Sequence, residues 1–123
     1  MKIHESGEMY LENILVLRER LEHVRSIDIV NYSGYSKPSI SRAVKLLNNA
    51  GYIEISGEGY ITLTEAGEEI AQKIFARHET LTAFLISIGV DAEKAAEDAC
   101  RMEHVISDDT YEKIKDFCYK DQK

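Results

Sequence analysis

Three side chains with metal-binding chemistry lie close together in the last quarter of the sequence. The segment Cys100-Arg101-Met102-Glu103-His104 offers a thiol, a carboxylate and an imidazole. It closes a run from Asp91 to His104 that contains neither Gly nor Pro, which predicts a helix. Residues three and four apart share a helical face, so Cys100, Glu103 and His104 should project together and can hold a transition metal. The alternative is a buried small side chain, a solvated charge and a helix-terminal cation.

A second pair of candidate ligands lies on the first predicted helix. Ser6 has the side chain of an N-cap, and apolar residues follow at helical spacing, which predicts a helix from about Gly7 to Leu21. Met9 and Glu12 then share one face of its first two turns. The alternative is a methionine that fills the core and a glutamate that complements the positive end of the helix dipole.

Length and composition describe an ordinary globular protein. The chain has 123 residues, enough for one core or two small ones, and is 44% hydrophobic and 30% charged. No stretch is apolar enough for a membrane span and the first residues lack a signal peptide, so we expect a cytoplasmic protein with no membrane partner. Two cysteines, Cys100 and Cys118, are too few for a disulfide framework.

The distribution of charge is more informative than its sum. The net charge is −7, which argues against a protein that coats nucleic acid without sequence preference. Between Asp28 and Glu54, however, no residue is acidic, and this gap contains Lys37, Arg42 and Lys45. The rest of the chain is rich in acidic residues, which favour the binding of a cation.

The acid-free stretch has the pattern of a helix-turn-helix. The segment from Val24 to Tyr35 predicts a short helix closed at Gly34, and Ser36 then caps a second helix that tolerates Pro38 in its first turn. The alternative is a helical hairpin with a solvated face. The residues expected to face the major groove and the phosphates of double-stranded DNA are Ser36, Lys37, Pro38, Ser39, Ser41, Arg42 and Lys45.

A two-stranded hairpin is predicted directly after this helix. The segments from Gly51 to Ile55 and from Tyr60 to Leu63 alternate apolar and polar residues, and Ser56-Gly57-Glu58-Gly59 between them is a turn sequence. The hairpin is typical of a winged helix-turn-helix. Because Glu58 at its tip repels phosphate, the wing is expected to contribute little DNA affinity.

The second half predicts three more helices. One runs from Thr64 to a Gly89 C-cap, one from Asp91 to His104, and one opens at Ser107 with Tyr111, Ile114, Phe117 and Cys118 on its inner face. We therefore expect a mostly α-helical fold, a winged helix-turn-helix with a two-stranded wing followed by a helical domain. Six apolar residues exceed what the short helices can bury, which predicts a homodimer that reads a two-fold symmetric operator; they are Ile74, Phe75, Leu81, Phe84, Leu85 and Ile88.

Several motifs together resemble the diphtheria toxin repressor family of iron-dependent and manganese-dependent repressors. They are Glu8-Met9-Tyr10-Leu11, the Ser-Lys-Pro-Ser-Ile-Ser-Arg helix, Leu63-Thr64-Glu65-Ala66-Gly67, Arg77-His78 and the segment from Ala99 to Asp108. The resemblance implies a winged-helix DNA-binding domain at residues 1–72 and a helical metal-binding and dimerisation domain at residues 73–123. It also implies that divalent metal bound between the domains licenses DNA binding. The chain corresponds to the short form without the SH3-like domain.

The resemblance also implies a ligand set. The primary site of iron-type members falls on Met9, Cys100, Glu103 and His104, all present in this chain. Glu12 and His78 match ligands of the manganese-type members and are candidates for a second site. The remaining ancillary iron-type positions are occupied by residues that bind metal poorly, Thr82 and Ala96.

Ferrous iron is the expected ion, with Mn²⁺ as the alternative, because the Met9 thioether and the Cys100 thiolate replace two carboxylates of the manganese-type site. Co²⁺, Ni²⁺ and Zn²⁺ should bind in vitro. The expected function is an iron-responsive repressor of metal-uptake genes, and the alternatives are a manganese-responsive repressor and a winged-helix regulator that answers to a small organic ligand. An enzyme is not expected, because nothing supplies an orienting group or an oxyanion site for Cys100.

Overall fold

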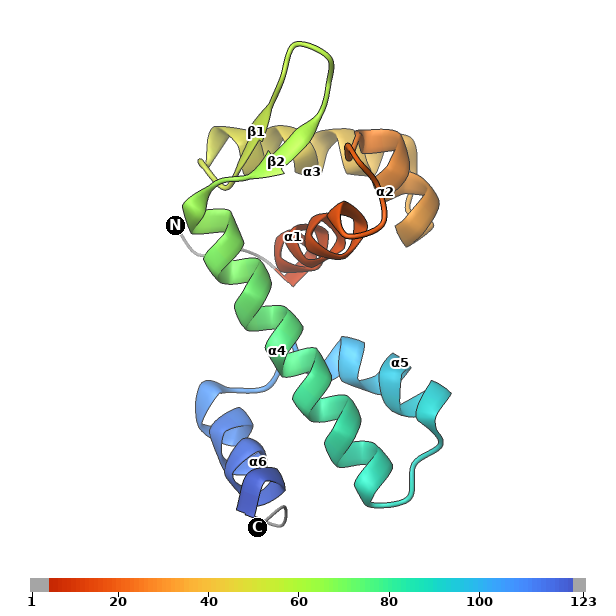
Figure 1. The fold of residues 1–123 in the computed structure, drawn as a ribbon, viewed down its shortest axis with the longest axis vertical. Coiled ribbons are helices and arrows are strands. Elements are labelled where there is room, and N and C mark those ends of the chain that lie inside the picture. The colour runs from red at the N-terminus through yellow and green to blue at the C-terminus, as the bar shows by residue number, and fades with distance from the viewer. Residues whose placement is uncertain (1–4, 121–123) are drawn as a thin grey trace. The chain divides into compact units, whose positions relative to one another are not determined.

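The computed structural model describes residues 5–120, which form helices and one small antiparallel sheet (Figure 1). In chain order the elements are α1 (Glu5–Arg18), α2 (Ser26–Ser33), α3 (Lys37–Asn49), β1 (Ile53–Ile55), β2 (Ile61–Leu63), α4 (Glu65–Ser87), α5 (Ala92–Met102) and α6 (Asp108–Lys120). The chain divides into two compact units, one ending at Gln72 and the other beginning at Lys73. The boundary falls inside α4, so this helix contributes to both units.

The first unit contains the predicted helix-turn-helix. Gly34 adopts the left-handed conformation (φ 79°) and its N–H donates to the carbonyl of Val30 at 2.9 Å, which ends α2. Ser36 then caps α3 by accepting a hydrogen bond from the Ser39 N–H at 3.3 Å, and Pro38 stands in the first turn, where no backbone donor is needed. The local signals at Gly34 and Ser36 therefore set both the turn and the start of the second helix.

The hairpin after α3 forms as expected but its strands are short. Residues Ile53 and Leu63 pair at one end and Ile55 and Ile61 at the other. The Ile61 N–H also donates to the Val24 carbonyl at 2.7 Å, so the loop before α2 adds an isolated bridge beside β2. Both structure and sequence thus give a winged helix-turn-helix within a mostly helical chain.

The core of the first unit comes from one apolar stripe on each element. Ile14, Ile29, Ile40 and Ile53 are each at most 1% exposed, one each from α1, α2, α3 and β1. Burying an isoleucine side chain contributes about 1.5–3 kcal/mol, so this cluster holds the helices and the wing together.

The first helix differs from its predicted bounds. Among the described residues it already includes Glu5 and Ser6, so Ser6 lies inside the helix and not at its N-cap. It ends at Arg18 because the chain tightens there: the Glu19 and Arg20 N–H groups donate to the carbonyls three residues earlier, at 3.2 and 3.0 Å.

A close joint ties the start of α4 to the end of α3. The Thr64 hydroxyl donates to the Gly51 carbonyl at 2.7 Å and accepts from the Gly67 N–H at 3.2 Å, while the Thr64 N–H donates to the Tyr52 carbonyl at 3.1 Å. Gly67 packs directly on Tyr52, because a Cβ built on Gly67 would overlap that carbonyl group. The first turn of α4 is therefore fixed against the chain that leaves the second helix of the helix-turn-helix.

A second tie joins α4 to α1. The Arg18 guanidinium makes a two-point ion pair with the Glu68 carboxylate, and Gln72 donates to the same carboxylate at 3.0 Å. The hydrogen bonds from Arg18, followed by that from Gln72, lower the pKa of Glu68 below its ordinary value. The carboxylate therefore keeps its charge to a lower pH than an unpaired glutamate would.

The second unit consists of the rest of α4 with α5 and α6. Gly89 (φ 105°) follows α4, Asp91 caps α5, and Ser107 caps α6 by accepting from the Thr110 N–H at 3.1 Å. Tyr111 lies on the buried face of α6 as expected. Phe117 does not, because its side chain is 54% exposed; its ring contacts the Phe84 ring of α4 edge to face. Within a single chain, the neighbouring helices cover the first turn of α6 at Tyr111 but leave Phe117, further along the helix, exposed. Among the described residues, no helix is long and apolar enough to cross a bilayer.

Gly67→Ala should destabilise the first unit. Alanine normally stabilises a helix by about 1 kcal/mol over glycine, but forcing a methyl group into a filled contact costs about 1–3 kcal/mol, and here the obstacle is backbone that cannot rotate away. The matched control is Gly57→Ala in the wing turn, where a Cβ meets open space at ordinary φ. Urea unfolding of both variants would check this; equal midpoints would show that the joint tolerates a side chain.

Candidate metal centre and DNA-reading helix

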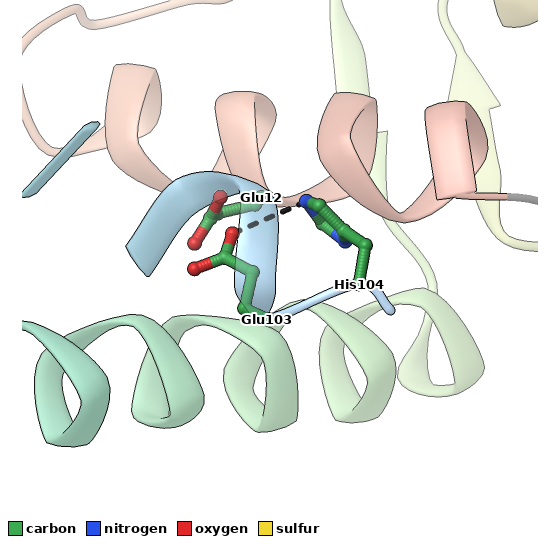
Figure 2. A group of neighbouring side chains, drawn as sticks. All are labelled: Glu12, Glu103 and His104. Carbon is green, nitrogen blue, oxygen red and sulfur yellow. Dashed lines mark ion pairs between the residues drawn. The ribbon is translucent and has the colours of Figure 1, made fainter. Parts of the chain in front are cut away.

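The candidate metal centre of the second unit is built on the Glu103 carboxylate. This side chain is 0% exposed, and its two oxygens face two imidazoles: Oε2 lies 3.0 Å from Nδ1 of His78, and Oε1 lies 3.2 Å from Nε2 of His104. Figure 2 draws Glu103 and His104 with the ion pair between them, and also labels Glu12, which belongs to α1 of the first unit. The buried carboxylate therefore has an imidazole nitrogen beside each of its two oxygens.

Helix α5 ends before the residues that sequence periodicity placed on it. The prediction was a helix through His104 with Cys100, Glu103 and His104 on one face, but the last helical residue is Met102 and Glu103 is the C-cap. If the helix continued, the Glu103 carbonyl would accept from the backbone four residues on; instead it accepts from the Arg77 guanidinium at 3.2 Å. The contact comes from another helix, so helical periodicity alone misplaces Glu103 and His104.

The cysteine of the motif lies on α5 itself, before the turn that carries Glu103 and His104. Cys100 is half-buried in the last turn of α5. Within the described part of the second unit, its sulfur does not join Glu103 and His104 in a group whose donor atoms all lie within 4.8 Å of one another. The donors that the second unit gathers are thus a carboxylate and imidazoles, which suit first-row divalent cations generally.

The two ancillary positions carry no metal-binding group, as the sequence indicated. The Thr82 hydroxyl donates to the His78 carbonyl at 2.7 Å, so it serves its own helix, and Ala96 is a half-buried alanine of α5. His78 remains, with its ring turned to Glu103.

The two candidate ligands of the first unit lie on α1. Met9 is half-buried and Glu12 is 7% exposed. A carboxylate that is this well shielded from water is unusual unless a cation or a hydrogen-bond donor accompanies it. Glu12 is therefore not the solvated helix-terminal acid of the alternative prediction.

The candidate DNA-reading surface is the outer face of α3. Six of its seven predicted residues are exposed and Ser39 is half-buried. The Ser36 hydroxyl donates to the Ser39 hydroxyl at 2.9 Å, and the Arg42 guanidinium donates to the same oxygen at 3.5 Å, so these side chains form a row along the first turns. The row presents hydroxyls, a guanidinium and the ammonium groups of Lys37 and Lys45, with no acid on the helix.

The sequence reasoning missed Arg77 as a functional residue, although a signal for it existed. Arg77 lies on the buried stripe of α4, three residues after Ile74 and four before Leu81, and both of these are at most 3% exposed. A cation on an apolar stripe is rare unless it is paired, so its position predicts an internal partner.

The donor set fits a divalent cation. Two ligand atoms held about 2.1 Å from one ion at right angles lie roughly 3 Å apart, which is also the separation of an ordinary ion pair. The 3.0 and 3.2 Å spacings at Glu103 satisfy both arrangements, and burial favours any cation that neutralises the carboxylate.

Known proteins with similar sequences include metal-binding transcriptional regulators. A family model described as the metal binding and dimerisation domain of the iron dependent repressor matches residues 64–122. The uncharacterised HTH-type transcriptional regulator MJ0568 of Methanocaldococcus jannaschii is 34% identical over 118 residues, covering 94% of each chain. The transcriptional regulator MntR of Escherichia coli O6:H1 is 33% identical over 111 residues, covering 90% of this chain and 72% of MntR.

A solved structure extends the likeness to the fold. The manganese regulator SloR superposes with a TM-score of 0.82 at 27% identity over 97% of this chain, which spans 55% of SloR. The relatives named here are transcriptional regulators, and the similarity covers both the winged helix and the helices that follow. The chain therefore belongs to the diphtheria toxin repressor family of metal-dependent transcriptional repressors.

Proposed function

We propose that this protein is a divalent-cation-activated repressor in which the metal centre controls operator binding. The observation that carries the proposal is the fully buried Glu103 carboxylate with an imidazole at each oxygen. A bound cation would supply positive charge to this carboxylate and draw further acidic or sulfur ligands toward it. His104 and Glu103 form the primary pair, and His78 with the other oxygen of Glu103 provides a second position.

The proposal assigns the remaining ligands to both units. Cys100 completes the contribution of the second unit, since it stands one helical turn before Glu103, while Met9 and Glu12 come from α1 of the first unit. A shared ion then makes the relation between the winged helix and the helical unit metal-dependent. A coupling of about 1–3 kcal/mol would change operator affinity roughly 5–150-fold.

Ferrous iron is the proposed ion. The thioether of Met9 and the thiolate of Cys100 are soft donors, and manganese binds weakest in the divalent series and prefers oxygen and nitrogen. A specific observation supports manganese as the second candidate, because the two groups that face the Glu103 oxygens are imidazoles, which suit Mn²⁺ better than sulfur does. The matched family model is named for iron and the superposed structure for manganese, so both ions occur among the relatives.

A regulator that answers to a small organic ligand is the remaining alternative, and one cavity favours it. A cavity of about 160 Å³ lies at the base of the wing in the first unit. Its walls combine apolar side chains with the charged groups of Arg18 and Glu22. The stacked rings of His23 and Tyr60, whose centroids are 4.0 Å apart, also line it. Operator binding that survives removal of metal would favour this cavity over the metal centre.

The test of the metal assignment is operator binding without oxygen across a metal series. The duplex would be selected from a random library in the presence of Fe²⁺, and chelator should abolish its binding. Fe²⁺ should activate at lower concentration than Mn²⁺, with Co²⁺ and Ni²⁺ also active. The double variant Met9→Asp, Cys100→Glu should reverse the order, because it replaces both soft donors with carboxylates. A wild-type chain that answers to Mn²⁺ before Fe²⁺ would remove the iron assignment.

Arg42→Ala should weaken binding to the selected duplex by about 1–3 kcal/mol and lower its preference over random DNA, because an arginine on the reading helix bonds base edges. Metal affinity should be unchanged. The matched control is Lys113→Ala, an exposed cation of α6. Competition titrations would measure both ratios, and an unchanged specific-to-random ratio for Arg42→Ala would contradict base readout.

The chain should form a homodimer through the second unit. Five of its large apolar side chains are exposed in the single chain: Ile86, Ile88, Val105, Phe117 and Tyr119. Sedimentation at micromolar concentration should report a dimer, and Phe117→Asp should shift it toward monomer because a carboxylate would be buried. Ile27→Asp, an exposed isoleucine of the first unit, is the matched control. A wild-type monomer with and without metal would contradict the two-fold operator.

A further inference from the structure

Arg77 holds the turn that carries the candidate ligands. Its side chain is 7% exposed and comes from α4 next to His78. Nη1 donates to the Glu103 carbonyl at 3.2 Å and to the Ile106 carbonyl at 3.3 Å, and Nη2 donates to the Asp108 carboxylate. One guanidinium therefore fixes three points between the end of α5 and the start of α6.

Few other backbone contacts hold this turn. The Val105 and Ile106 N–H groups both donate to the carbonyl of Met102, at 3.1 Å each. These bonds close the turn on the last residue of α5. The bonds that join its backbone to α4 come from Arg77.

The carboxylate that pairs with Arg77 belongs to Asp108, which is not a candidate metal ligand. Asp108 is 75% exposed, whereas the buried carboxylate of Glu103 faces His78 and His104. Arg77 thus bonds the backbone carbonyl of Glu103, while the two imidazoles face its carboxylate oxygens. The Tyr111 ring, 5.0 Å from the guanidinium carbon, covers the plane of the fork.

We propose that Arg77 is a positioning residue for the metal centre, which sets the direction in which Glu103 and His104 present their ligand atoms. This inference rests on the proposed function, in which those two side chains bind the cation. Partners that orient ligands without touching the metal typically change metal affinity about 10–100-fold when they are lost. Lysine cannot replace the fork, because an ammonium is a point charge on a flexible stem and cannot span three acceptors in one plane.

The experiment is a Co²⁺ titration of the full chain, read by the visible d–d absorption that reports coordination geometry. Arg77→Lys should bind Co²⁺ about 10–100-fold more weakly than wild type and give an altered spectrum. Asp108→Asn should show a smaller loss, because its amide oxygen still accepts while the charge is gone. The matched control is Arg101→Lys, the same exchange at an 82% exposed arginine of the same unit, which should behave as wild type.

Thermal unfolding without metal separates positioning from simple stabilisation. Metal-free Asp108→Asn should melt close to wild type. Metal-free Arg77→Lys should melt lower, because the turn loses its bonds to α4. It should still be folded at the titration temperature, where its loss of Co²⁺ affinity and its altered spectrum persist. An Arg77→Lys variant that binds Co²⁺ with wild-type affinity and spectrum would overturn the inference. So would a fall in metal-free stability that accounts for the whole loss, with Asp108→Asn unchanged. A wild-type chain that binds no Co²⁺ would overturn the proposed function and this inference together.

Discussion

The second unit depends on the burial of one carboxylate. Placing Glu103 away from water is costly unless its charge is paired, and removing one partner of a buried pair costs about 3–5 kcal/mol. The surrounding elements meet this requirement from several directions. Helix α4 supplies His78 to one oxygen and the turn supplies His104 to the other, while Arg77 bonds the backbone of the same residue. All three helices of the unit therefore meet near Glu103: α4 carries His78 and Arg77, α5 ends just before Glu103, and α6 begins at Asp108, which pairs with Arg77.

The same constraint explains why a cation is the natural effector in the proposed mechanism. A site that already gathers a carboxylate and two imidazoles gains from any divalent cation, and the acid-rich composition of the chain supplies further negative charge. Helix α4 carries His78 in the second unit, and its first turn is tied to the end of α3 through Thr64 and Gly67 in the first unit. The proposed route from metal to DNA therefore follows covalent continuity along one helix as well as ligands shared between units.

Sequence patterns predicted the winged helix-turn-helix closely because its signals are local. Gly34 needs a left-handed conformation, Ser36 caps the next N–H groups, and alternation marks the wing on either side of its turn. The family followed from further motifs, above all Glu8-Met9-Tyr10-Leu11 and the segment from Ala99 to Asp108. Local patterns did not predict the contacts between distant residues: α5 ends at Met102, and the Glu103 carbonyl accepts a hydrogen bond from Arg77 of α4. The ligand set assigned from the family stays a proposal.

The central claim, that metal and operator binding are coupled, is tested most directly by measuring one ligand's affinity in the presence of the other. The Fe²⁺ affinity of the full chain would be titrated without oxygen, with and without a saturating operator duplex. Coupling is reciprocal, so operator should raise metal affinity by the factor by which metal raises operator affinity, roughly 5–150-fold. Equal Fe²⁺ affinities with and without operator would contradict a metal centre that controls DNA binding.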